Sequence, residues 1–303
     1  MRGCRTVSSM LTRRTILGGG AGVAMSSILA PRPAAARVAL GGESPLRWVV
    51  FYGQTANEDV LAGYDIVILD PAFKGSLARI GKASASVCGY LSIGEIRTAS
   101  PAFASLDRDA LLEENPSWPG TRRVDIRHPS WSASLLDQQI PALLSAGFKG
   151  LMLDTLDTPP YLEETNPSRY KGMATAAVDI VQSIRKRWPD ISIIANRGYA
   201  ILPRLVDCID AIIAESLLTT PNLAGTGFVL ADGRSVELQM RLLEPARNRH
   251  PALPILTLDY WDLSDRDGIC RIYGRERALG HHPYVATRLL DRVVPKPACE
   301  ASL

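Results

Sequence analysis

Acidic residues follow several apolar runs in this 303-residue sequence. Asp154 comes directly after the run 149–153, and Glu215 comes directly after the run 211–214. A charged side chain at the end of a buried run is unfavourable unless it is paired or functional. Two facing carboxylic acids can cleave a glycosidic bond: one attacks or stabilises the anomeric carbon, and the other, its pKa raised by its surroundings, protonates the leaving oxygen. Asp154 and Glu215 are therefore candidates for such a catalytic pair.

Eight apolar runs predict the strands that would position these acids. They are residues 47–52, 64–70, 87–92, 149–153, 191–196, 211–215, 255–260 and 281–285. Between them, residues 132–146, 173–187, 236–249 and 265–279 carry apolar side chains at helical spacing. Alternating strands and helices over about 250 residues are typical of a (β/α)8 barrel, and no Gly-x-Gly-x-x-Gly motif indicates a dinucleotide fold. We therefore predict an α/β fold, a single TIM-type barrel domain over residues 45–293.

Polar residues at the carboxyl ends of barrel strands converge on one mouth. Because alternate strands contribute to the same layer, Asp154 on the fourth strand and Glu215 on the sixth should face each other across a narrow cleft. The competing interpretation is that any one of these acids caps the N-terminus of the next helix. For Asp70 the two interpretations have equal support, whereas for Glu215 the capping interpretation has less, because Glu is a poor N-cap residue. Asp157 can cap the helix that follows Asp154. The remaining acids at or near strand ends are Asp70, Glu95 and Asp259.

Aromatic residues also gather near the predicted strand ends. Sugar rings present apolar C–H faces that stack on aromatic rings, while Tyr and Trp keep a polar tip for hydroxyl groups. Each aromatic alone is compatible with core packing, but several at one rim favour a saccharide cleft. These residues are Tyr52, Tyr90, Tyr199, Tyr260, Trp261 and Tyr284.

Other chemistries have weaker support. The chain has four histidines, and the His281–His282 pair suits a core role better than a metal site. No Gly-x-Ser-x-Gly elbow and no phosphate-binding loop occur. We therefore predict neither a metal nor a cofactor. A long irregular segment from residue 93 to about residue 131 is predicted to be a functional loop.

The first 36 residues have the composition of a twin-arginine export signal. The Arg13–Arg14 pair precedes a mild apolar stretch, residues 18–30, and a small-residue cleavage site near Ala36. The stretch is too short to span a bilayer, which needs about 20 apolar residues. We predict a signal peptide over residues 1–36, a periplasmic or secreted protein, and no stable membrane insertion after cleavage.

Charge and cysteine content limit the class of partner. Removing the five arginines of residues 1–36 leaves 29 basic and 31 acidic residues, a net charge of −2. Without a basic patch interleaved with aromatics, nucleic acid is not an expected partner. Cys88 lies in a strand and is predicted to be a buried thiol, whereas the sequence leaves open whether Cys270 and Cys299 form a disulfide. The oligomeric state is not predicted.

Several short motifs resemble glycoside hydrolase family 114, which contains endo-α-1,4-polygalactosaminidases. They are Gly89–Glu95, the Asn-Pro-x-Trp-Pro-Gly segment 115–120, the segment 147–157, Asn196–Tyr199 and Ala214–Leu217. The resemblance covers residues 48–288, and within the family it is nearest to the hydrolase domain of an exopolysaccharide protein.

The resemblance implies a TIM-type barrel and a retaining endo-hydrolase of an α-1,4-linked galactosamine-rich polysaccharide. It implies that Asp154 is the nucleophile and Glu215 the acid/base. By position, Asp70, Tyr90, Glu95, Asn196 and Tyr260 would line the cleft, and we add Asp157, Asp259 and Tyr284 as expected substrate-binding residues. Two alternatives remain: a polysaccharide-binding barrel without turnover that assists export, and a hydrolase of another α-glycan.

Overall fold

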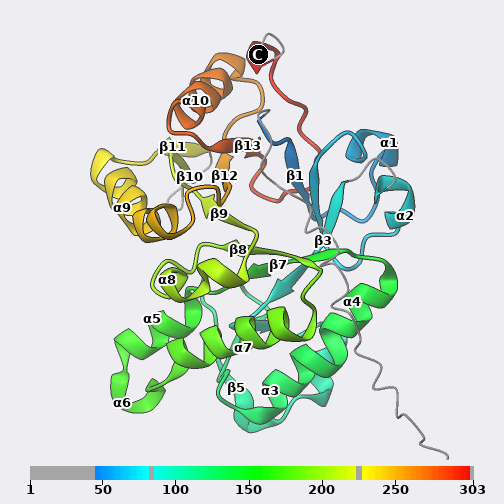
Figure 1. Cartoon of the computed structure of the whole chain (residues 1–303), viewed down its shortest axis with the longest axis vertical. Helices are drawn as coiled ribbons and strands as arrows, with labels where there is room; N and C mark the ends of the chain where they lie inside the picture. Colours follow the sequence, from blue (N-terminus) through cyan, green and yellow to red (C-terminus); the bar gives the residue numbers. More distant parts are fainter. Residues whose placement is uncertain (1–44, 82–84, 223–226, 301–303) are drawn as a thin grey trace, which may run out of the picture. The chain divides into compact units, whose positions relative to one another are not determined.

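The computed structural model describes residues 45–81, 85–222 and 227–300, and in this part of the chain eight parallel strands form one sheet (Figure 1). Successive strands along the chain are also hydrogen-bonded neighbours, as in a (β/α)8 barrel. The strands are β1 (Trp48–Phe51), β2 (Ile66–Leu69), β3 (Ser86–Ser92), β7 (Gly150–Asp154), β8 (Ser192–Asn196), β9 (Ala211–Glu215), β12 (Ile255–Tyr260) and β13 (His282–Ala286).

The two ends of this sheet meet between β13 and β1. The indole nitrogen of Trp48 donates to the carbonyl oxygen of His282 at 2.7 Å, and the backbone nitrogen of Tyr52 donates to the carbonyl oxygen of Leu290 at 2.7 Å. The barrel is therefore nearly closed, which confirms the predicted TIM-type fold. The predicted strand ends differ from the observed ones by at most two residues.

The strands are continuous apolar runs because helices cover their outer face while their inner face packs inside the barrel. Every residue of β1, β2 and β8 is buried. In β7 and β9 only the last residue, Asp154 or Glu215, is less buried than the residues before it. Close packing also explains Gly150, because a Cβ atom there would lie 2.6 Å from the Cys88 sulfur.

The long helices follow the predicted spacing. The helix α7 has the predicted bounds, and α9 begins before residue 236 because the Asp232 carboxylate accepts hydrogen bonds from the Arg234 and Ser235 nitrogens. Gly147, at a φ of 110°, ends α4. The α-helices are α1 (Glu58–Leu61), α2 (Leu77–Ile80), α3 (Pro129–Ala133), α4 (Ile140–Ala146), α5 (Thr158–Thr165), α6 (Pro167–Tyr170), α7 (Met173–Arg187), α8 (Leu202–Leu205), α9 (Gly233–Arg249) and α10 (Arg266–Ala278). A π-helical turn, η4 (Ser134–Gln139), joins α3 to α4, and short 3-10 turns are η2 (Pro101–Ser105), η3 (Arg108–Ala110), η5 (Val206–Cys208) and η6 (Ala298–Glu300).

The segment after β3, predicted to be irregular, contains a small antiparallel sheet. Its strands are hydrogen-bonded in the order β4 (Glu95–Arg97), β6 (Thr121–Val124) and β5 (Leu111–Glu114). These strands are only three or four residues long and largely polar, so they lack the apolar signal of the barrel strands. The prediction of an irregular loop was therefore wrong for this part of the segment.

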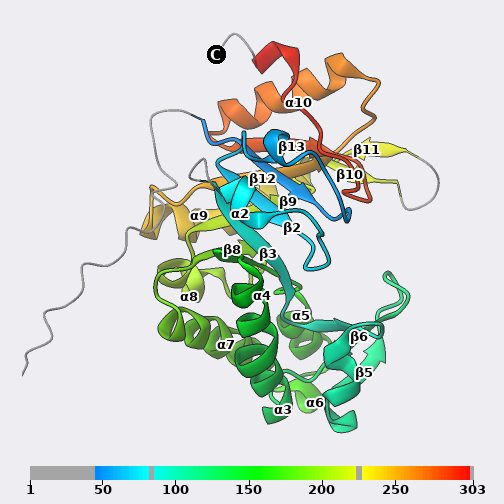
Figure 2. The same cartoon turned by 90° about the vertical axis from the view of Figure 1, so that its right-hand side faces the viewer.

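A second excursion follows β9, where β10 (Thr219–Pro221) pairs with β11 (Phe228–Leu230) in an antiparallel hairpin. In Figure 2 the hairpin extends on the same side of the barrel as β5 and β6. Both excursions follow the carboxyl end of a barrel strand, β9 or β3, so both lie at the mouth where the strand-end acids lie.

The cysteines have two roles. Cys270 on α10 forms a disulfide with Cys299 in η6, which settles the pairing that the sequence left open and fastens the end of the described chain to the barrel. Cys88 is buried inside β3, as predicted.

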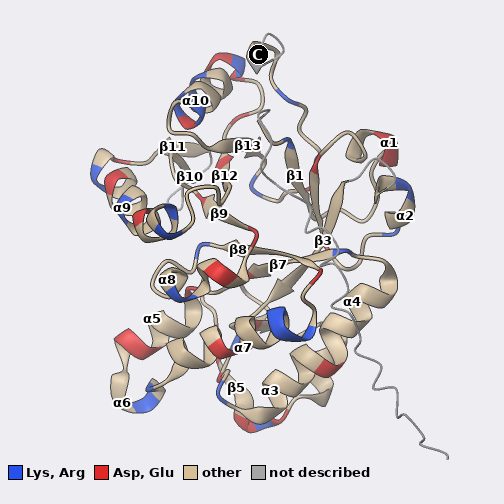
Figure 3. Ribbon diagram, viewed as in Figure 1, with Lys and Arg blue, Asp and Glu red and all other residues tan. Residues whose placement is uncertain are grey.

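The predicted signal peptide, residues 1–36, lies outside the described residues. Among the residues that are described, no helix is long and apolar enough to cross a bilayer. Acidic and basic residues are interspersed along α9 and α10, so both helices carry both signs of charge (Figure 3).

Candidate active site

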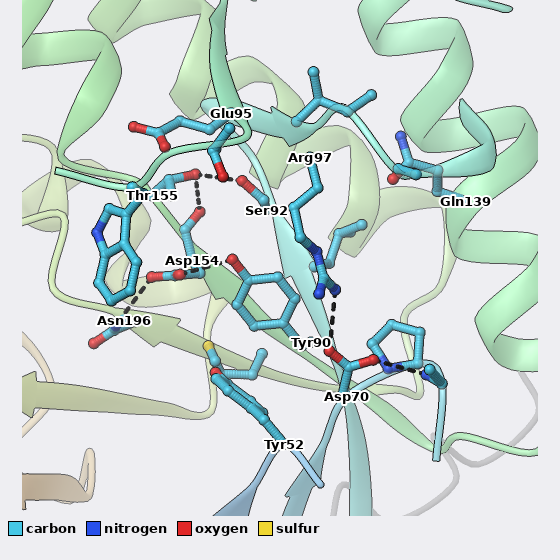
Figure 4. Close-up of a pocket in the computed structure, with 18 of the residues that line it drawn as sticks. Tyr52, Asp70, Tyr90, Ser92, Glu95, Arg97, Gln139, Asp154, Thr155 and Asn196 are labelled. Carbon is cyan, nitrogen blue, oxygen red and sulfur yellow. Dashed lines mark hydrogen bonds and ion pairs between the residues drawn. The ribbon is translucent and has the colours of Figure 1, made fainter. Parts of the chain in front are cut away.

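A cavity of about 1010 Å³ opens at the carboxyl ends of the barrel strands. Residues of six of the eight barrel strands contribute to its wall, together with the β4–β6–β5 excursion and the segment after β13. Polar side chains at its floor include Tyr52, Tyr90, Asp154, Asn196, Glu215 and Tyr260. Figure 4 shows several of them converging from different strands. The cavity is therefore where strand-end chemistry is expected in a TIM barrel.

Asp154 and Glu215, the last residues of β7 and β9, come together in this cavity. Asn196 ends the intervening strand β8, and its amide nitrogen donates to Asp154 Oδ1 at 2.9 Å and to Glu215 Oε2 at 2.7 Å. Because one nitrogen is bonded to both carboxyl groups, those two oxygens are separated by no more than the sum of the two distances, about 5.6 Å. The geometry that the sequence predicted for this pair is therefore present.

Each carboxyl group also receives a hydrogen bond from a tyrosine. The Tyr90 hydroxyl donates to Asp154 Oδ2 at 3.0 Å, and the Tyr260 hydroxyl donates to Glu215 Oε1 at 2.5 Å. The ring of Tyr52 packs edge-on against Tyr90, with centroids 5.3 Å apart. Burial raises the pKa of both Tyr90 and Tyr260 well above 10.0. The second cause is the negative charge of the nearby carboxylate, which is Asp154 for Tyr90 and Glu215 for Tyr260. Both therefore remain neutral donors at any working pH.

The surroundings of Glu215 change its acidity. Burial, and next the negative charge of Asp154, raises the pKa of Glu215 above its usual 4.5. The hydrogen bonds from Asn196 and Tyr260 partly oppose this shift, because they stabilise the ionised form. A carboxyl group that keeps its proton toward neutral pH beside an ionised carboxylate is suited to act as a general acid.

The residues that directly follow Asp154, Asn196 and Glu215 have a left-handed backbone conformation. Thr155, Arg197 and Ser216 have φ values of 58°, 52° and 57°. This conformation is unfavourable for residues other than glycine, most of all for β-branched Thr. It turns the chain sharply at the ends of β7, β8 and β9.

Hydrogen bonds from the segment that follows β3 hold the turn at Thr155. The Thr155 hydroxyl oxygen accepts hydrogen bonds from the backbone nitrogens of Ile93 and Gly94 at 3.1 and 2.7 Å, and the hydroxyl donates to the Asp154 carbonyl oxygen at 2.7 Å. Sequence reasoning did not identify Thr155, and the only local signal is a Thr directly after a strand-end acid.

Two further predicted residues line the cavity but are engaged with other protein groups. Asp70 forms an ion pair with Arg97 at 3.0 Å and accepts a hydrogen bond from the Ala72 nitrogen at 2.8 Å. Glu95 is only 4% exposed and accepts hydrogen bonds from Asn115 and Thr158. Asp70 therefore lies at the rim as expected, whereas Glu95 chiefly joins parts of the protein to one another.

Asp157 lies outside the cavity wall. It forms an ion pair with Arg197 at 2.9 Å and accepts a hydrogen bond from the Gly198 nitrogen at 3.0 Å. Its side chain makes no capping hydrogen bond at the start of α5. Both the cleft position and the capping role expected for Asp157 are therefore corrected: its side chain holds the loop that follows Asn196.

Tyr284 does not line the cavity either. Its ring packs on Trp48 with centroids 5.5 Å apart, and its hydroxyl accepts a hydrogen bond from the Val294 nitrogen at 3.0 Å. At 2% exposure it belongs to the core, so the prediction that it contacts substrate is withdrawn. Of the other aromatics predicted at the rim, Tyr199 is buried and its hydroxyl donates to Gln239.

Asp259 points away from the cavity, although Leu258 and Tyr260 on either side of it line the wall. Alternate side chains of a strand point to opposite faces, so Asp259 lies behind the barrel wall. Its Oδ1 accepts hydrogen bonds from the Leu218 and Thr219 nitrogens at 2.9 and 2.7 Å. The prediction of a substrate contact is corrected to a structural role in the segment after β9.

Asp259 shares this buried position with Glu276 of α10. Burial raises the pKa of each carboxyl group to about 7. For Asp259 the second cause is the negative charge of Glu276. Asp259 Oδ2 and Glu276 Oε1 are buried without a donor, while Glu276 Oε2 lies 2.5 Å from His281 Nδ1. A proton on one carboxyl group satisfies both acceptors.

Glu276→Gln is expected to become more stable relative to wild type as the pH rises from about 4.5 to about 7. In this interval the folded wild type keeps a proton on Glu276 that the unfolded chain releases, so the wild type loses up to ~3 kcal/mol of unfolding free energy. Burial lowers the pKa of His281 to about 4, so His281 makes the unfolding free energy rise with pH in both proteins. Urea unfolding at pH 5 and pH 7.5 measures the difference, and a pH-independent difference would contradict the shared proton.

Among the described residues, no group of three or more His, Cys, Asp and Glu side chains is arranged to hold a metal ion. The candidate site is the hydrogen-bonded unit of Asp154, Asn196, Glu215, Tyr90 and Tyr260.

Two solved structures are similar to this chain in fold. The glycoside hydrolase domain of PelA from Pseudomonas aeruginosa is 26% identical, with a TM-score of 0.73 over 82% of this chain and 98% of that chain. The Aspergillus fumigatus protein Ega3, solved with galactosamine, is 15% identical, with a TM-score of 0.61 over 86% of this chain and 96% of that chain. At this identity the Ega3 likeness shows a shared fold.

Two uncharacterised bacterial proteins are also similar. A Deinococcus radiodurans protein is 26% identical over 265 residues, 80% of each chain, and a Thermotoga maritima protein is 30% identical over 158 residues, 46% of this chain and 49% of the other. The model of the glycoside-hydrolase family GH114 matches residues 30–302. Since this match spans nearly the whole sequence, the protein belongs to glycoside-hydrolase family GH114.

Proposed function

We propose that this protein is an exported endo-acting retaining hydrolase of an α-1,4-linked, galactosamine-rich polysaccharide. The observation that carries the proposal is the single amide nitrogen of Asn196 bonded to both Asp154 and Glu215. Retaining glycosidases hold their two carboxyl groups about 5–5.5 Å apart, whereas inverting enzymes need about 6.5–9.5 Å to admit a water molecule. The upper limit of about 5.6 Å between the bridged oxygens favours retention.

In the first step, an Asp154 oxygen attacks the anomeric carbon while Glu215 gives its proton to the glycosidic oxygen. The bond between that carbon and oxygen breaks, and the sugar becomes esterified to Asp154. In the second step, the Glu215 carboxylate takes a proton from water as the water oxygen attacks the same carbon, which releases Asp154. Two displacements at one carbon leave its configuration unchanged.

The neighbouring donors suit these two roles. Tyr90 and Asn196 each donate to one oxygen of Asp154, which orients the carboxylate and stabilises its charge when the ester breaks. The raised pKa of Glu215 favours the protonated form that the first step needs, and the carboxylate form left by that step suits the second.

The substrate class rests on the family and its relatives. PelA and Ega3 have the same fold, and galactosamine is the sugar in the Ega3 structure. The cavity wall also includes Trp118 in the excursion after β3 and Leu289 after β13, and a cavity lined from several excursions suits binding within a chain rather than at its end. Export through the twin-arginine route is proposed from the Arg13–Arg14 signal.

The direct test is incubation of the purified exported protein with partly deacetylated α-1,4-galactosamine polymer, beside fully acetylated polymer and other α-glycans. We expect new reducing ends and a rapid fall in chain length from the galactosamine polymer. Binding without new reducing ends would indicate the binding barrel, and cleavage of another α-glycan alone would replace the substrate.

Tyr260→Phe is expected to shift the alkaline limb of the activity–pH profile to higher pH. The Tyr260 hydroxyl stabilises ionised Glu215, so its loss raises the pKa of Glu215 further and the acid keeps its proton to higher pH. Measuring kcat/KM from pH 4 to pH 9 tests this shift. Tyr199→Phe, which removes a hydroxyl bonded to Gln239, is the matched control, and an unmoved or lowered limb in Tyr260→Phe would contradict the proposed acid.

A further inference from the structure

Trp118 is a large aromatic side chain exposed in the wall of the cavity. It is 59% exposed, and it lines the same cavity as Asp154 and Glu215. Exposing an indole to water forgoes the free energy of burying its large apolar face. Among the described residues, Trp118 and Leu289 are the strongly exposed large hydrophobic residues that also line this cavity.

The turn that carries Trp118 is held by several hydrogen bonds. The Trp118 nitrogen donates to the Asn115 carbonyl oxygen at 3.0 Å, and the Thr121 nitrogen donates to the Trp118 carbonyl oxygen at 3.1 Å. The Ser117 nitrogen donates to Asn115 Oδ1 at 3.0 Å. Pro116, directly before Ser117, restricts the backbone of the turn further. The indole is therefore held on a defined turn between β5 and β6.

Glu95 fastens this turn to the barrel. The Asn115 amide nitrogen donates to both Glu95 oxygens at 2.9 and 3.1 Å, and the Thr158 hydroxyl donates to Glu95 Oε1 at 2.9 Å. Thr158 begins α5, directly after the loop that follows Asp154. One nearly buried carboxylate thus connects the Trp118 turn to the chain that positions the proposed nucleophile.

We propose that Trp118 is a stacking platform for a sugar ring of the polysaccharide outside the pair of rings joined by the cleaved bond. This inference rests on the proposed function and adds a binding site to it. The apolar C–H face of a hexosamine packs on the indole, and a protonated amine of a neighbouring sugar is attracted to the negative face of the ring. Asn115 and Glu95 act here as positioning residues, because their hydrogen bonds hold the turn that carries the platform.

The platform predicts a dependence on substrate length. Trp118→Ala is expected to lower kcat/KM on the long polymer about tenfold or more, since the stacked face is lost. If Trp118 binds a ring outside the cleaved pair, a short aryl glycoside does not occupy that site, and kcat/KM on it should stay within about twofold of wild type. Trp118→Phe should recover part of the activity on polymer, and Tyr161→Ala, which removes an aromatic side chain that is 51% exposed outside the cavity, should change neither assay.

Binding is tested separately from turnover. In the Glu215→Gln protein, a soluble galactosamine oligosaccharide should quench tryptophan fluorescence, and Glu215→Gln/Trp118→Phe should lose most of this quenching. Asn115→Ala should weaken polymer turnover while sparing the short substrate, with an unchanged far-UV circular dichroism spectrum.

The outcomes separate this inference from the proposed function. If wild type cleaves the polymer and Trp118→Ala cleaves it equally well, the platform is wrong and the hydrolase stands. If wild type does not cleave the polymer, the proposed function fails, and the fluorescence titration alone decides whether Trp118 contacts the sugar. Equal losses on polymer and short substrate would also overturn the platform, because they would indicate a general defect.

Discussion

Asp154→Asn is expected to reduce turnover of the polysaccharide by at least about 10³-fold, because the amide cannot form the glycosyl ester. The fold should be retained, since Tyr90 and Asn196 remain in place on either side of residue 154. Removing one of two neighbouring acids relieves the electrostatic repulsion with Glu215, so the melting temperature should stay the same or rise.

A small anion distinguishes the role of Asp154 from that of Glu215. In Asp154→Ala, azide can occupy the vacated space and attack the anomeric carbon of an aryl glycoside directly, so the product should be a glycosyl azide of inverted configuration. Proton NMR of the product measures the configuration. Glu237→Gln, an exposed change on α9, is the control and should behave as wild type, and undiminished turnover by Asp154→Asn would refute the assignment.

Glu215→Gln should lower turnover of the natural polymer by about 10²–10⁴-fold, because the leaving oxygen no longer receives a proton. An aryl glycoside with a good leaving group does not need that proton, so its first step should proceed and the glycosyl-enzyme should accumulate. In Glu215→Ala, added azide should attack this intermediate from the side where water normally enters, giving a glycosyl azide of retained configuration.

The pH profile of Glu215→Gln gives a second readout. In wild type we expect the raised pKa of Glu215 to set the alkaline limb, because activity should fall as the proposed acid loses its proton. The variant should lose that limb on an aryl glycoside whose first step limits the rate. An alkaline limb that survives the substitution would show that another group is the proton donor.

The barrel could be predicted because its strands are continuous apolar runs, a pattern strong enough to show in one sequence. The closeness of Asp154 and Glu215, the proposed catalytic pair, could be predicted because each acid ends an apolar run at its carboxyl end. The β4–β6–β5 sheet could not, since its short polar strands are stabilised by tertiary hydrogen bonds, such as that from Asn115 to Glu95, and not by an apolar pattern.

Distance from a strand end was a poor guide to which side chains line the cavity. Asp259 and Tyr260 are adjacent near the end of β12, but only Tyr260 reaches the cavity wall, because consecutive side chains point to opposite faces. Asn196 was expected among the cleft residues, but its bond to both acids depends on the register of β7, β8 and β9. The left-handed backbone at Thr155 likewise depends on donors from a distant segment, Ile93 and Gly94.

The most direct test of the central claim is peptide mass spectrometry of Glu215→Gln protein quenched in acid during turnover of an aryl galactosaminide. The account predicts a mass increase of one sugar residue on the peptide that contains Asp154, absent in Asp154→Asn/Glu215→Gln. A sugar adduct on a different carboxylate, or rapid turnover through an inverted product with no adduct, would contradict it.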